Sequence, residues 1–102
     1  MSAVPVTDAL LAAAGLFGVG LAGALLRRNA ITIFLSIEVM LNAANLALVG
    51  YGAHVGGYSG QVVVFFAIAV AAAEAAVGLA IFVSVFRNEE SIDVNRANLL
   101  KW

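Results

Sequence analysis

The 102-residue chain is 64% hydrophobic and only 11% charged, with a mean hydropathy of +1.06. A soluble domain of this length could not bury so much apolar surface, so the composition predicts an integral membrane protein. The net charge of −1 says nothing about nucleic acid, but the sequence has no basic patch that could hold it. The absence of cysteine excludes disulfides and thiolate metal sites, and one histidine cannot build a metal site alone.

The first apolar segment predicts a transmembrane helix at about residues 5–26. Pro5 suits a first helical turn, and Thr7 and Asp8 suit a helix N-terminus. Residues 9–26 carry no charge, and the first basic residues follow this stretch rather than precede it. We therefore expect the segment to remain as a membrane anchor and not to be a cleaved signal peptide.

Small residues recur at intervals of four along this first helix. One row is Ala14, Gly18 and Ala22, and the other is Gly15, Val19 and Gly23. Such rows are typical of close contacts between transmembrane helices, although a general richness in Ala and Gly would also produce them. We predict that the row through Gly18 packs against a helix of this chain or of a partner.

A second helix is predicted at about residues 30–51, with Glu38 as its only charge, roughly 12–14 Å inside the span by helical rise. Asn42 and Asn45 follow Glu38 at i+4 and i+7 and so share its face. Lipid offers these groups no hydrogen-bond partner. Interhelical hydrogen bonding and a hydrated proton path both remain open. We assign function to Glu38 and polar support to Asn42 and Asn45.

Dense turn-forming residues predict a loop over 52–60, in which we expect His54 to be solvated or interfacial. A third helix is then predicted at about residues 61–86, longer than a bilayer requires, so it should tilt, bend or protrude. Glu74 lies near its middle among small residues, which indicates an acid that faces protein rather than lipid.

Basic residues follow the first and third helices but are absent from the second loop. They are Arg27 and Arg28 in the first loop and Arg87, Arg96 and Lys101 after the third helix. The positive-inside rule then predicts an external N-terminus and a cytoplasmic C-terminus. The chain divides into a three-helix transmembrane domain, residues 1–87, and a polar cytoplasmic tail, residues 88–102.

Two acids at membrane depth on different helices are the main chemistry that the sequence offers. Desolvation favours the neutral form of a carboxyl group, so such a Glu can bind and release a proton near neutral pH. Glu38 and Glu74 each lie about halfway along a span, so they could pass a proton sideways through water or polar groups. Three helices cannot enclose a complete channel, so the chain is expected to belong to a larger assembly.

These motifs resemble a known family. Matching stretches are residues 27–30, 38–46, 60–61, 65–66, 71–80 and 93–101. Together they resemble the small three-helix membrane subunit of respiratory complex I, the proton-pumping NADH:quinone oxidoreductase (the subunit K family). The resemblance spans nearly the whole chain. Family members often carry an acid just before Gly60, where Ser59 stands here, a departure that concerns only the outer loop.

The resemblance implies a non-redox subunit of a translocase, placed between the quinone-side subunits and an antiporter-like pumping subunit. Flavin, iron–sulfur clusters and quinone are then expected in other subunits, with no cofactor or metal on this chain. Glu38 and Glu74 match the family's glutamates of the central hydrophilic axis, and Arg27 and Arg28 match its cytoplasmic arginine pair. The resemblance favours a location in a bacterial inner membrane over one in an organellar membrane. Membrane lipid is then expected to contact the chain.

The main alternative is the small subunit of a multi-subunit cation/proton antiporter, which shares the surroundings of Asn42 and Asn45. That family lacks an acid in an Ala-rich third helix, so Glu74 argues against it. A small multidrug transporter would have four helices and an acid in the first. A rotor-ring subunit would have two helices, and a purely structural assembly protein would not need two midplane acids.

Overall fold

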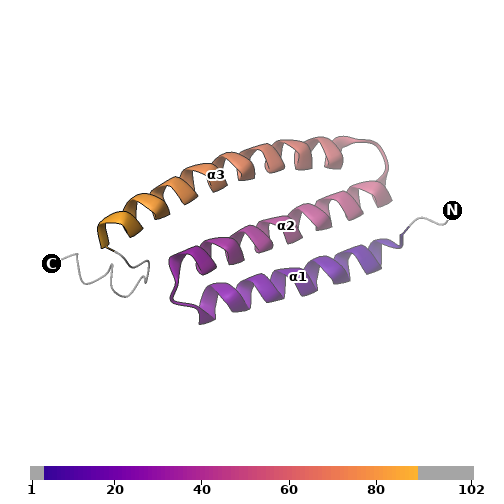
Figure 1. Cartoon of the computed structure of the whole chain (residues 1–102). Coiled ribbons are helices and arrows are strands. Elements are labelled where there is room, and N and C mark those ends of the chain that lie inside the picture. Colours follow the sequence, from indigo (N-terminus) through magenta and orange to yellow (C-terminus); the bar gives the residue numbers. More distant parts are fainter. Residues whose placement is uncertain (1–3, 90–102) are drawn as a thin grey trace.

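The computed structural model describes residues 4–89, which form three helices joined by short turns. These are α1 (Val6–Leu26), α2 (Ala30–Val55) and α3 (Ser59–Glu89). They run up, down and up, with α2 between the other two (Figure 1). All three are long and apolar enough to cross a membrane, which confirms the predicted all-α class with three spans. Most of the expected tail, from residue 90 onward, lies outside the described residues.

The first two helices begin at residues that satisfy their free backbone N–H groups. Pro5 precedes α1, and its carbonyl accepts from the backbone N–H groups of Asp8 at 3.1 Å and Ala9 at 3.2 Å. Asn29 precedes α2, and its side-chain Oδ1 accepts from the N–H groups of Ile31 at 2.9 Å and Thr32 at 3.2 Å. This pattern is a typical Asn N-cap, and it ends the α1–α2 turn sharply.

Helices α2 and α3 extend further than the sequence predicted, so the loop expected over 52–60 is wrong. The turn is only residues 56–58, where Gly56 and Gly57 take φ values of 96° and 78°. Gly52 and Gly60 lie within helices instead, where a Cβ on Gly60 would come 3.1 Å from the Cα of Gly52. These two glycines therefore permit close helix contact rather than a turn. At its far end α3 continues to Glu89 instead of residue 86.

Helices α1 and α2 pack closely through small side chains. Ala13 and Ala43 are 5% and 1% exposed, and a Cβ on Gly20 would come 2.8 Å from the Ser36 carbonyl oxygen. A Cβ on Gly23 would overlap the Ser36 hydroxyl, which donates to the Thr32 carbonyl at 2.8 Å. The contact has little room for larger side chains on α1.

The predicted row Ala14, Gly18 and Ala22 does not form this contact. All three residues are exposed, and a Cβ on Gly18 would meet nothing within 4 Å. Residues spaced by four do not stay on one face, because a helix has 3.6 residues per turn and the row winds around it. Residues in a long contact between two helices instead recur on average about every 3.5 positions. The row through Gly18 therefore does not pack against another helix of this chain. That it packs against a helix of a partner stays a prediction.

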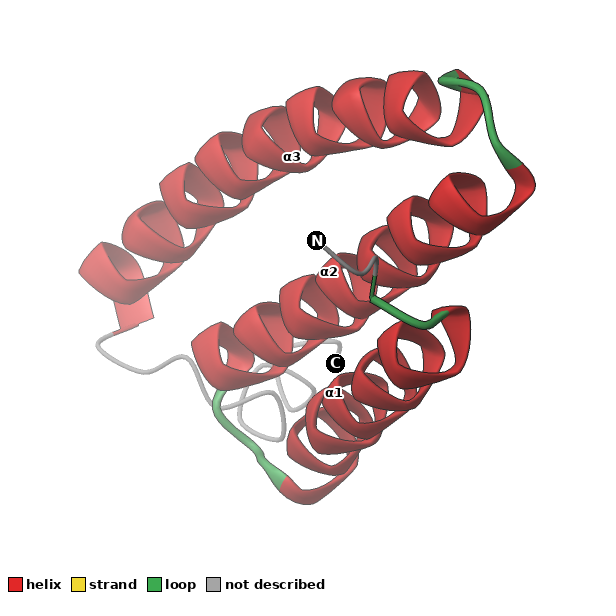
Figure 2. Ribbon diagram, turned by 90° about the vertical axis from the view of Figure 1, so that its right-hand side faces the viewer, coloured by secondary structure: helices red, strands yellow, loops and turns green. Residues whose placement is uncertain are grey.

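Helices α2 and α3 meet mainly near their two ends. At one end Gly52 faces Gly60. At the other end the rings of Phe34 and Phe82 pack edge to face at 5.3 Å, and a Cβ on Gly78 would come 2.8 Å from the Phe34 ring. Figure 2 shows α3 following a gentle arc that diverges from the α1–α2 pair. Between these two contacts, cavities lie between α2 and α3.

Candidate functional site

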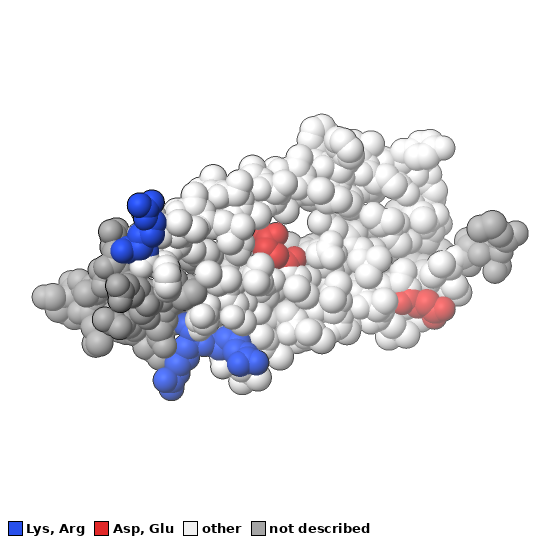
Figure 3. Space-filling model, in the orientation of Figure 1, with Lys and Arg blue, Asp and Glu red and all other residues white. Residues whose placement is uncertain are grey.

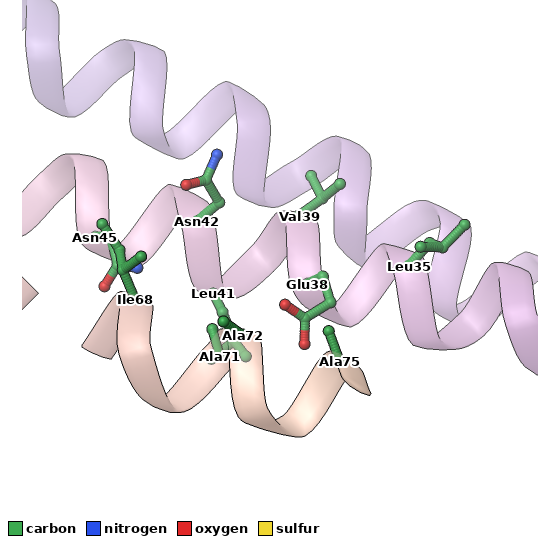
Figure 4. Close-up of a pocket in the computed structure, with 10 residues that line it drawn as sticks. All are labelled: Leu35, Glu38, Val39, Leu41, Asn42, Asn45, Ile68, Ala71, Ala72 and Ala75. Carbon is green, nitrogen blue, oxygen red and sulfur yellow. The ribbon is translucent and has the colours of Figure 1, made fainter. Parts of the chain in front are cut away.

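A groove-like cavity of about 490 Å³ lies between α2 and α3. Glu38, Asn42 and Asn45 line it from α2, so the structure brings together the three polar residues that the sequence placed on one face. In Figure 4 the Glu38 carboxylate lies on the side of α2 that faces α3, and the Asn42 amide points away from α3. The α3 wall is apolar and includes Ala72 and Ala75.

The second acid lines a separate cavity of about 260 Å³ between the same two helices. Glu74 and Val70 contribute from α3, and Asn45 contributes from α2. Three residues line both cavities, namely Leu41, Asn45 and Ala71. Glu38 shares its cavity with Ala75, the neighbour of Glu74 in sequence, so the two acids lie at similar depth along the bundle.

The polar residues differ in exposure. Glu38 and Asn45 are half-buried, whereas Asn42 and Glu74 are exposed on the isolated chain. Within residues 4–89 the side-chain hydrogen bonds are those of Asn29 and Ser36, so the four site residues make none there. Their hydrogen-bonding groups are thus available to water or to a partner.

Sequence reasoning missed Leu41 and Ala71 as site residues. Each is an ordinary apolar residue in an apolar span, and only the register between α2 and α3 places both beside the two cavities. A partial signal existed, because Leu41 lies at i+3 from Glu38 and Ala71 lies at i−3 from Glu74. That spacing indicates a shared helix face but does not indicate which residues meet across the interface.

Charge is separated along the molecule. Arg27 and Arg28 in the α1–α2 turn and Arg87 in the last turn of α3 lie at one end, and acidic atoms lie at mid-length (Figure 3). Over the described part of the chain the opposite end, with the α2–α3 turn, carries no Lys or Arg. His54 lies at this end, in the last turn of α2 rather than in the expected loop, and its side chain is exposed on the isolated chain.

The chain offers no set of ligands typical of a metal centre in the part that the structure describes. Residues 4–89 contain no group of three or more His, Asp or Glu side chains placed to hold a metal ion. The whole sequence lacks cysteine, the usual ligand of iron–sulfur clusters. The chemistry of the site therefore rests on carboxyl and carboxamide groups.

Three membrane-length helices with two carboxyl groups at mid-length define a small multi-pass membrane protein with intramembrane acids. Residues 8–102 match the family model described as NADH-ubiquinone/plastoquinone oxidoreductase chain 4L. The chain belongs to this family, whose bacterial members are named NADH-quinone oxidoreductase subunit K. The resemblance inferred from the motifs is confirmed.

Individual relatives match over almost their full length. The chain is 52% identical over 93 residues to NADH-quinone oxidoreductase subunit K 1 of Geotalea daltonii, covering 91% of this chain and 93% of that protein. It is 53% identical over 92 residues to subunit K of Salinibacter ruber, covering 90% and 91%. It is 49% identical over 100 residues to subunit K 2 of Koribacter versatilis, covering 98% and 97%.

Proposed function

We propose that this chain is a membrane-arm subunit of a proton-pumping NADH:quinone oxidoreductase in which Glu38 and Glu74 transfer protons. The observation that carries the proposal is that the two acids lie at similar depth in adjoining cavities between α2 and α3. A lateral path through these sites would couple quinone reduction, performed in other subunits, to pumping. Flavin, iron–sulfur clusters and quinone belong to those other subunits.

The physical argument begins with the cost of charge in a bilayer. A carboxylate near the centre of the hydrocarbon region is expensive, whereas its protonated form is tolerated, so Glu38 and Glu74 are suited to alternate between the two. Carboxamides both donate and accept hydrogen bonds, so Asn42 and Asn45 can hold water beside the acids. A volume of about 490 Å³ is ample for several waters, each of which takes roughly 30 Å³ in the liquid.

Partner subunits complete the path. Glu74 is exposed on the isolated chain, and both cavities open at the surface, so the three helices do not enclose the acids. We assign the missing walls to the quinone-side subunits and to an antiporter-like subunit of the same arm, with lipid around the remaining surface. Bacterial relatives support a location in the bacterial inner membrane.

The arginine distribution supports an orientation with the N-terminus outside and the α1–α2 turn in the cytoplasm. Arg27 and Arg28 would then serve assembly and cytoplasmic contacts, because they lie at the end of the helices and not beside the acids. A Val55→Cys variant should react with an impermeant thiol reagent from the outer side. Reaction from the cytoplasmic side alone would reverse the orientation.

The decisive test replaces each acid by its amide. Glu38→Gln and Glu74→Gln keep size and hydrogen bonding but cannot exchange a proton, so assembly should persist while protons pumped per NADH and energy-coupled quinone reduction fall severalfold. Asp variants should be milder. Glu38→Gln should be the more severe, because the Glu38 cavity also holds Asn42 and Asn45.

A matched control is Asp8→Asn, which makes the same chemical change in the first turn of α1, away from both cavities. This variant should pump normally. Wild-type rate and stoichiometry in both glutamate variants would contradict the proposed function and leave the acids a structural role.

A further inference from the structure

The boundary between the two acid-lined cavities consists of two apolar residues and one polar residue. Leu41, Asn45 and Ala71 line both cavities, and of these only Asn45 has a polar side chain. A proton that moves between Glu38 and Glu74 along α2 and α3 must therefore pass an apolar contact or the carboxamide of Asn45.

The apolar route is unfavourable for a proton. Leu41 and Ala71 have no side-chain donor or acceptor, and narrow apolar constrictions exclude water and so stop ion movement. Leu41 lies between Glu38 and Asn45 in the α2 sequence, one turn from each. Two of the three residues that the cavities share therefore cannot relay a proton.

The carboxamide of Asn45 has the properties that a bridging group needs. It provides one acceptor oxygen and two N–H donors, which allows it to hold water on both of its sides. It is half-buried, and over residues 4–89 it forms no hydrogen bond, so these groups are not already used by the chain's own helices. Asn45 of α2 and Ile68 of α3 both line the Glu38 cavity, and Figure 4 labels both.

We propose that Asn45 positions water on the path along which Glu38 and Glu74 exchange a proton, and that Leu41 and Ala71 form the apolar part of the boundary that this water must pass. This inference rests on the proposed function. In the transfer an O–H bond of protonated Glu38 breaks, and the proton passes along a chain of waters in the groove, each of which gains one proton and releases another. The water held at Asn45 is one member of this chain, and at its end the Glu74 carboxylate forms an O–H bond. Asn45 does not change its protonation, so it is a positioning residue.

Asn42 provides the matched comparison. It is the same side chain on the same helix, but it lines the Glu38 cavity alone and its amide points away from α3. If carboxamides act only as general polar support for Glu38, the two positions should be about equivalent. If Asn45 bridges the cavities, substitution there should be much the more damaging.

The experiment measures protons pumped per NADH in the assembled complex for Asn45→Leu and Asn42→Leu. We expect at least a severalfold loss for Asn45→Leu and a clearly smaller loss for Asn42→Leu. Asn45→Gln should retain most pumping because it keeps the carboxamide. Adding Leu41→Ser to Asn45→Leu should restore part of the loss, because a hydroxyl in the boundary offers water a second route, a rescue that a structural role for Asn45 does not predict.

Two results would overturn the inference and leave the proposed function intact. These are normal pumping by Asn45→Leu, or equal losses at the two Asn positions, in either case with both Glu→Gln variants defective. If Asn45→Leu fails to assemble, Asn45→Val takes its place, since it removes the carboxamide with less added bulk. Normal pumping by both Glu→Gln variants would instead overturn the proposed function and this inference together.

Discussion

The two helix interfaces of this chain are built on opposite plans. Helices α1 and α2 are in close contact through small residues such as Ala13, Gly20 and Ala43. Helices α2 and α3 are in close contact at Gly52–Gly60 and at Phe34–Phe82, and between these contacts both acids line cavities. The first interface joins two helices closely, and the second leaves cavities in which a few polar residues stand among apolar ones.

This difference follows from how helices associate in lipid. Apolar side chains gain little by leaving lipid for protein, so close van der Waals contact through small residues stabilises the α1–α2 pair. The same close contact along α2 and α3 would remove the space that water needs beside Glu38. Close contacts near the two ends instead hold α3 near α2 and leave cavities beside both acids. The looser interface is the one to which we assign proton transfer.

The largest effect is expected at the tight interface, from Gly20→Leu. A Cβ at this position would come 2.7 Å from Met40 Cγ and 2.8 Å from the Ser36 carbonyl oxygen, and the backbone oxygen cannot move aside easily. Overpacking typically costs about 1–3 kcal/mol and often more against backbone. Little assembled complex should be found on native gels of the membranes, and Gly20→Ala should be intermediate. A normal amount of complex would show that the α1–α2 contact tolerates separation.

A moderate effect is expected at the far end of the loose interface, from Gly78→Ala. The added Cβ would come 2.8 Å from Phe34 Cε2, at the end of a side chain that can rotate. The added methyl group should cost roughly 1 kcal/mol of stability, so the amount of assembled complex should fall. Pumping should also change, because the edge of the groove shifts. The double variant Gly78→Ala with Phe34→Leu should recover part of this loss. Additive losses in the double variant would show that the two residues do not interact.

The smallest effect on the chain's own fold is expected from Gly18→Leu, because a Cβ there meets nothing within 4 Å. We nevertheless predict reduced incorporation into the complex, since the exposed row with Ala14 and Ala22 suits a close contact with a partner helix. Incorporation can be measured as the amount of this chain in the purified complex. Normal incorporation would indicate that this face of α1 contacts lipid.

Features that depend on composition and on one helix at a time were predictable. The three spans followed from hydropathy, and the common face of Glu38, Asn42 and Asn45 followed from helical period. Features that depend on how two helices meet could not be predicted from the sequence. Gly52 and Gly60 resemble turn residues in sequence, yet they lie in helices because each accommodates the backbone of the other.

The candidate site shows the same limit. Both acids were identified from their isolation in apolar spans, whereas Leu41 and Ala71 became visible only through the register of α3 against α2. The row through Gly18 failed as an internal contact because small residues permit close packing without specifying which face is used. Pairing between helices depends on the sum of many weak contacts, which local patterns do not reveal.

The unequal helix lengths have a consequence for the surrounding lipid. Helix α1 has 21 residues, about 31 Å at the usual rise, and α3 has 31 residues, about 46 Å. A bilayer that matches α1 is too thin for an upright α3, which must lean or project to fit. Because the divergence of α3 from α2 sets the width of the groove beside Glu38, a thicker or thinner bilayer would change that width. If the groove holds the water that we propose, lipid chain length would affect how much of it lies beside the acids.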